Sequence, residues 1–95
     1  MVVGVLQLQL RLSDVHSLKG KRGQVKKIIH RVRNTFPVAV AEVGSNDLWQ
    51  KAEIGVSAVG NSARTVNACL DHVLNFVEDM HLAEVMDHSL EIIHC

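Results

Sequence analysis

The positively charged side chains of residues 17–33, SLKGKRGQVKKIIHRVR, are the side chains best suited to ligand chemistry in this 95-residue chain. The segment contains seven Lys or Arg residues and no Asp or Glu. Lysine and arginine bind phosphate oxygens through charge and hydrogen bonds, so this composition is typical of a phosphate- or RNA-binding surface. A solvated helix face has the same composition, and the sequence leaves both interpretations open. The candidate anion-binding residues are Lys19, Lys21, Arg22, Lys26, Lys27, Arg31 and Arg33.

The formal net charge of the chain is zero, but the charges are separated along it. The stretch from Lys19 to Arg33 carries +7, whereas the stretch from Glu42 to the end carries nine acidic residues against Lys51 and Arg64, a net charge of −7. This asymmetry indicates either an anion-binding face or two regions that pair with each other in the fold.

Gly20 and Gly23 interrupt the basic segment near the start of the helix that it predicts. Each glycine costs about 1 kcal/mol relative to alanine inside a helix. Lys19, Lys21 and Arg22 also lie near the helix N-terminus, where the helix dipole disfavours positive charge. We therefore expect the first turns to be frayed or irregular, and an anion to relieve the crowding of charge.

Hydrophobic periodicity predicts the elements that hold this segment. Leucines alternate with polar residues before Leu12, as in a half-buried strand, and apolar residues then recur at helical spacing. Pro37 disfavours helical geometry in the residue before it, which ends the first helix. The predicted elements are a strand over Val2–Leu12, a helix over Leu18–Thr35, a strand over Val38–Val43, a turn over Gly44–Asp47, a strand over Leu48–Val59, a helix capped by Asn61 or Ser62 that reaches Met80, and a strand over Ala83–Ile93.

This order, βαββαβ, predicts a single α+β domain over residues 1–95 with the ferredoxin-like arrangement, an antiparallel four-stranded sheet with both helices on one face. Right-handed crossovers place the first and third strands in the centre. The open face of the sheet would carry Gln7, Gln9 and Arg11, none of which stacks on bases as an aromatic ring does. RNA binding is therefore expected to be electrostatic and salt-sensitive, and to use the first helix.

Trp49 is the other residue with a candidate role, because tryptophan often anchors an interface. The residue either contacts a homodimer partner or another protein, or covers the open end of the core. The two uncovered edges of the predicted sheet offer a second route to a homodimer.

A phosphate-ester hydrolase is a third interpretation, because small acylphosphatases share the ferredoxin-like scaffold and bind phosphate in the first strand-to-helix loop. That loop contains Ser13, His16 and Ser17 here, but the glycine-rich acylphosphatase signature with its arginine is missing. The six histidines lack the paired spacing of a structural zinc site. We therefore expect a protein that is not an enzyme and that uses no metal or cofactor.

Composition is that of an ordinary globular protein, with 47% hydrophobic and 21% charged residues. The apolar runs are shorter than a membrane span, and the N-terminus lacks the basic flank of a secretory signal. The two cysteines, Cys69 and Cys95, do not make a disulfide framework. These features predict a cytoplasmic protein without a membrane partner.

Three pieces of the chain resemble the YlxP-like family of small bacterial proteins of unknown function: HSLKGKRGQVKKIIHRVRNTFPVAVAEV (16–43), DLWQKAEIGVSAVGN (47–61) and LDHVLNFVE (70–78). The resemblance implies a ferredoxin-like fold and a bacterial cytoplasmic home. It also implies a translation-linked role, because family genes often lie near those for translation initiation and ribosome-binding factors. Gly20 departs from the family, whose members usually have a Glu that can form a capping box with Ser17.

The prediction for function is thus a non-enzymatic binding module that associates with RNA or the ribosome through its basic first helix. The alternative is a protein-interaction or assembly factor that forms a homodimer through Trp49 and a sheet edge.

Overall fold

The computed structural model describes residues 1–46 and 48–95, and its elements follow the predicted order βαββαβ. Asp47, the last residue of the predicted turn, lies outside the described residues. The elements are β1 (Val2–Arg11), α1 (Leu18–Thr35), β2 (Ala39–Gly44), β3 (Lys51–Gly60), α2 (Ala63–Met80) and β4 (Glu84–His94).

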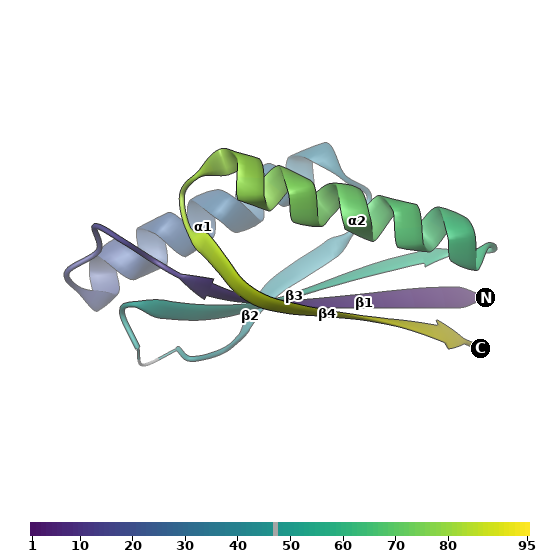
Figure 1. Cartoon of the computed structure of the whole chain (residues 1–95), viewed down its shortest axis with the longest axis horizontal. Helices are drawn as coiled ribbons and strands as arrows, with labels where there is room; N and C mark the ends of the chain where they lie inside the picture. The colour runs from purple at the N-terminus through teal and green to yellow at the C-terminus, as the bar shows by residue number, and fades with distance from the viewer. Residues whose placement is uncertain (47) are drawn as a thin grey trace.

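The four strands form one sheet in the order β2-β3-β1-β4, and every neighbouring pair is antiparallel. The first and third strands therefore lie in the centre, as predicted. Figure 1 shows both helices on one face of the sheet and the two chain ends side by side. The ferredoxin-like α+β fold is confirmed.

The core lies between the sheet and the two helices. Alternation along β1 buries Leu6, Leu8 and Leu10 beneath the helices and leaves Gln7 and Gln9 exposed on the opposite face. Each helix contributes one apolar stripe, because residues three or four apart lie on the same side of a helix. The buried stripe residues are Val25, Ile28 and Val32 of α1 and Val66, Leu70, Val73 and Val77 of α2.

α1 is a regular helix from its first turn, so the expected irregular start is wrong. The Ser17 side chain accepts a hydrogen bond from the Gly20 amide at 3.0 Å, and the Lys21 amide donates to the Ser17 carbonyl at 3.0 Å. These two bonds satisfy amides at the helix N-terminus without the glutamate of a capping box. The helix continues through Gly20 and Gly23 and ends at Thr35, as Pro37 predicts.

The other element boundaries are close to those predicted. Ser62, one of the two predicted residues, caps α2. β3 begins at Lys51 and not at Leu48, because the chain first turns at Ser45, which has a φ of 58°. The Leu48 amide closes this turn by donating to the Ser45 carbonyl at 3.1 Å.

Neither described helix combines the length and the apolar character that crossing a membrane requires. Within residues 1–46 and 48–95, no three His, Cys, Asp or Glu side chains are grouped as metal ligands would be.

Candidate nucleic-acid interface

Six of the seven cations of the basic segment lie on the exposed side of α1. We name these six residues the α1 basic face, which extends over about 21 Å of the helix from its first member to its last. The packing of the apolar stripe against the sheet causes this arrangement, because the remaining side of the helix then faces solvent. The α1 basic face consists of Lys19, Arg22, Lys26, Lys27, Arg31 and Arg33.

Lys21 is not part of this surface, and its prediction as an exposed anion-binding residue is wrong. Its side chain is only 1% exposed. Lys21 lies four residues before Val25 and seven before Ile28, which places it in line with the buried stripe. Helical periodicity was the signal in the sequence that identifies this position.

The buried charge of Lys21 is compensated by a carboxylate of β2 and by a backbone carbonyl just after this strand. The Lys21 ammonium lies 3.1 Å from Glu42 Oε2 and donates a hydrogen bond to the Ser45 carbonyl. Glu42 follows Val40 by two residues on β2, so both side chains point toward the helices. Glu42 and Ser45 are structural partners of Lys21 that the sequence does not reveal, because nothing local indicates which carboxylate α1 covers.

The cations of the α1 basic face have no carboxylate within 4.0 Å among residues 1–46 and 48–95. The ion pairs in this part of the chain are Arg11–Glu84 and Lys21–Glu42. Among the described residues, Lys21 is therefore the one cation of the basic segment that forms an ion pair with the acidic region. Arg33 is partly engaged, since its Nη2 donates to the Val40 carbonyl at 2.9 Å.

Gly23 leaves a gap in the cation-rich surface of α1. A β-carbon added there would meet no atom within 4 Å, so the position is open to solvent. A shallow hollow borders Gly23 and is flanked by Lys26, Lys27 and Arg31. The absence of a side chain at Gly23 therefore leaves the surface between these cations open to solvent.

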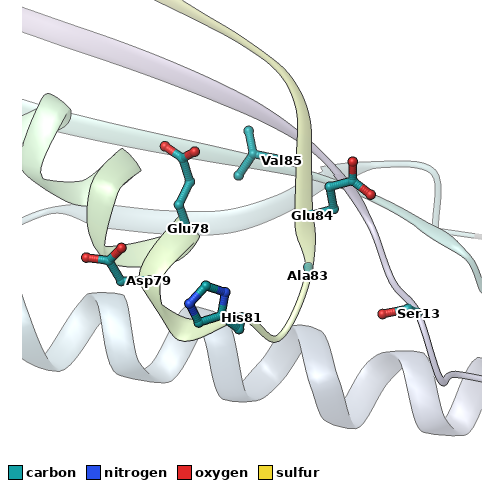
Figure 2. A pocket seen from close by; sticks show the side chains of 7 residues that line it. All are labelled: Ser13, Glu78, Asp79, His81, Ala83, Glu84 and Val85. Atoms are coloured by element: carbon teal, nitrogen blue, oxygen red, sulfur yellow. The ribbon is translucent and has the colours of Figure 1, made fainter.

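A second hollow, between the end of α2 and the start of β4, has the opposite charge. Figure 2 shows the carboxylates of Glu78 and Asp79 on the last turn of α2, His81 on the connection and Glu84 on β4. Glu84 pairs with Arg11 at 3.1 Å, so Glu78 and Asp79 supply the remaining negative charge, which disfavours a polyanion at this hollow. The charge separation of the sequence thus becomes a separation between two places on the surface.

In the loop between β1 and α1, which the hydrolase interpretation needs, Ser17 and His16 both contact other residues. The Ser17 hydroxyl accepts the capping bond from Gly20. The His16 ring lies 6.3 Å from the Trp49 ring, tilted by 53°. Trp49 itself is exposed and lies in the loop before β3.

None of the three aromatic residues, all of them described, supplies a base-stacking platform on the open face of the sheet. Phe36 and Phe76 meet edge to face on the helix side, with ring centroids 5.3 Å apart. Gln7 and Gln9 are exposed, and Arg11 pairs with Glu84 at 3.1 Å. The prediction that the sheet offers no aromatic rings for bases is confirmed.

Comparison with known proteins identifies a family and supports the fold. The family "Protein of unknown function (DUF503)" matches residues 3–90. "Uncharacterized protein YlxP" of Bacillus subtilis (strain 168) is 35% identical over 77 residues, which cover 81% of this chain and 84% of that protein.

Two solved structures resemble this one in fold alone. The de novo designed protein Foldit4 has a TM-score of 0.57 at 15% identity, over 99% of this chain and 97% of that one. LarC2, the C-terminal domain of a cyclometallase involved in the synthesis of the NPN cofactor of lactate racemase, in its apo form, has a TM-score of 0.50 at 9% identity, over 98% of this chain and 55% of that one. The family match and the similarity to YlxP both extend over most of the chain, and the protein therefore belongs to the DUF503 family of proteins of unknown function.

Proposed function

We propose that this protein is a cytoplasmic, non-enzymatic RNA-binding module that associates with the ribosome through the α1 basic face. One observation carries the proposal: six exposed cations share the solvent side of one helix, with no carboxylate partner among the described residues. Exposed charges that are not neutralised within the protein attract a polyanion and release its condensed counterions on binding.

The length of the α1 basic face favours a polymer over a single phosphate group. Its cations extend over about 21 Å, whereas duplex nucleic acid carries one phosphate charge per about 1.7 Å of its axis. Several phosphates can therefore contact the face at once. Recognition rests on the RNA backbone, because the sheet has no aromatic platform and the side chains of the face are mostly flexible lysines and arginines.

The salt dependence of RNA binding tests this proposal. Lys26→Gln with Lys27→Gln removes two charges from the centre of the face, and both side chains are exposed. The affinity falls as salt rises, so the slope of log affinity against log salt is negative. Each lost phosphate contact should make this slope shallower by about 0.7 to 0.9, and the loss of both contacts by about 1.4 to 1.8. Fluorescence anisotropy with a labelled RNA measures the slope.

The matched control is Lys51→Gln with Arg64→Gln, which removes the same charge from exposed positions outside α1. We expect this control to keep the slope of the wild type. Equal slopes for the two folded variants would contradict the proposal, because net charge alone would then explain the binding.

The ribosomal part of the proposal needs its own experiment. Bacterial ribosomes are sedimented with the protein at low and at high salt. We expect the wild type and the control to sediment with ribosomes at low salt, and the Lys26→Gln, Lys27→Gln variant to remain in the supernatant. RNA binding that depends on the face without sedimentation would reject the ribosome and retain RNA as the ligand.

A second candidate function is a protein-interaction or assembly factor that forms a homodimer through Trp49 and a sheet edge. The exposure of Trp49, at 38%, is the observation that favours it. Trp49→Ala should then weaken self-association without changing the circular dichroism spectrum, as sedimentation at micromolar concentration would show.

A further inference from the structure

The exposed large apolar side chains of the described residues avoid both helices, and four of the seven, Val43, Val59, Met86 and Ile93, lie on strands. None lies on α1 or α2, whose outer surfaces are polar. Val3 pairs with Val59 of β3 and with Ile93 of β4, so these three side chains form one row across the sheet. Val59 is 66% exposed and Ile93 is 40% exposed.

We define the open sheet face as Val3, Val5, Gln7, Gln9 and Arg11 of β1, together with the strand residues that lie beside them on the side away from the helices. Val43, 59% exposed, belongs to this face. A β-carbon at Gly55 would lie 3.0 Å from Val43 Cγ1, and Gly55 pairs with Gln7.

The centre of the open sheet face is a shallow hollow over β1, β3 and β2, lined by small or uncharged side chains. Val5 of β1 lies beside Ser57 of β3, which lies beside Ala39 of β2. In the next row, Gln7 of β1 lies beside Gly55 of β3, which lies beside Ala41 of β2. Small side chains let a second surface approach closely, because sheets pack about 10 Å apart.

Most charged residues of the open sheet face lie at its margins; the exception is Glu53 of the central strand β3, which lies beside Gln9 in the row next to Arg11 and Lys51. Asp87 and Glu91 are on β4, which is an edge strand. Arg11 and Lys51 lie at one end of the central strands, where Arg11 already pairs with Glu84. An uncharged centre with a polar rim is the usual anatomy of a protein interface.

We propose that the open sheet face is the interface for a second copy of this chain, so that two sheets stack with their helices outward. A two-fold axis parallel to the strands places β1 of one copy over β3 of the other. Val3 then faces Val59 of the second copy, and the apolar ends of both sheets meet. At the other end the same axis places Arg11, which keeps its pair with Glu84, over Lys51 of the second copy, whereas an axis across the strands would place the apolar end over the charged end.

The area of the face is sufficient for a stable dimer. Strands of 10, 6, 10 and 11 residues, at about 3.4 Å per residue and about 4.8 Å between strands, give roughly 600 Å² per copy. Stacking two copies would bury about 1,200 Å² in total, which exceeds the roughly 1,000 Å² expected of a biological interface. The α1 basic face remains on the outside, so self-association is compatible with RNA binding and independent of it.

Analytical ultracentrifugation of the full chain at micromolar concentrations tests the proposal. We expect a wild-type mass of twice the chain's 10.5 kDa. Val3→Lys and Ser57→Lys each place a charge on the open sheet face where both cross-strand neighbours are uncharged, and each should raise the dissociation constant by roughly 100-fold. The two positions lie on different strands, so one variant serves if the other fails to fold.

Asn75→Lys is the matched control, since it adds the same charge on the exposed surface of α2 and should leave the dimer intact. A monomeric wild type at every concentration would overturn the proposal. A dimer that survives both sheet variants but dissociates with Trp49→Ala would also overturn it and assign self-association to the loop before β3.

Discussion

Replacement of Lys21 by methionine should cost far more stability than the same change at any lysine of the α1 basic face. Methionine keeps much of the side-chain volume, but it leaves the Glu42 carboxylate without its cation. Glu42 Oε2 is itself buried and, apart from the Lys21 ammonium at 3.1 Å, has no hydrogen-bond partner among residues 1–46 and 48–95. Removing one partner of a buried ion pair costs about 3 to 5 kcal/mol.

The expected magnitude lies at the lower end of that range. One fifth of the Glu42 side chain is exposed, so water can partly solvate the carboxylate after the substitution. A loss of about 3 kcal/mol is nevertheless a large part of the roughly 5 to 14 kcal/mol expected for a chain of this length. It corresponds to a melting temperature lower by about 12 to 24 °C.

Urea unfolding followed by circular dichroism measures this loss. With a slope of about 1 to 3 kcal/mol per molar urea, the midpoint should fall by about 1 to 3 M. The matched control is Lys26→Met, which makes the same substitution at an exposed position of the same helix and should change stability by less than about 0.5 kcal/mol.

A double-mutant cycle separates the ion pair from the other contacts of Lys21. Lys21→Met combined with Glu42→Met removes both charges and should recover most of the loss, because a buried ion pair and an apolar pair are often of similar stability. The Ser45 carbonyl still loses its donor, which leaves a deficit of about 1 kcal/mol. If Lys21→Met costs no more than Lys26→Met, the ion pair does not stabilise the fold and the reasoning is refuted.

Three further substitutions test the packing and capping of the helices by the same urea titration. The methyl group added by Gly23→Ala would meet no atom within 4 Å, and alanine is the better helix former, so the protein should become more stable by about 1 kcal/mol. A loss of stability would show that the glycine is needed for the fold. Gly4→Ala should cost about 1 to 3 kcal/mol, because the new methyl group would lie 2.5 Å from Val66 Cγ1 and 2.6 Å from Leu70 Cδ1; a neutral result would mean that α2 shifts freely on the sheet. Ser62→Ala should cost about 1 kcal/mol by removing the cap of α2, and an unchanged midpoint would show that the cap contributes nothing.

The basic and acidic regions of the chain do not neutralise each other in the fold. Only Lys21 of the basic segment meets an acid of the C-terminal part among the described residues. The remaining cations stay on α1, whereas Glu78, Asp79 and Glu84 border a hollow at the end of α2. A polyanion that approaches the helix side of the molecule therefore meets attraction over one helix and repulsion at the end of the other.

Local pattern is sufficient for most of the fold. Alternation in Val2–Arg11 predicts a strand with one buried face, and apolar residues at helical spacing predict which sides of α1 and α2 enter the core. Pro37 predicts an end of α1 near Thr35, where the helix ends. These features depend on neighbours in the sequence, so periodicity and backbone geometry are enough to infer them. The exposure of most of the basic segment follows from the same periodicity.

Contacts between distant residues required the three-dimensional arrangement. Periodicity places Lys21 in line with the buried stripe, but its carboxylate partner is Glu42, which lies 21 residues later and reaches α1 only when β2 pairs with β3. The row that joins Val3, Val59 and Ile93 likewise exists only through strand register. A buried charge is stable only beside a partner, and the position of that partner depends on packing between elements rather than on any local pattern.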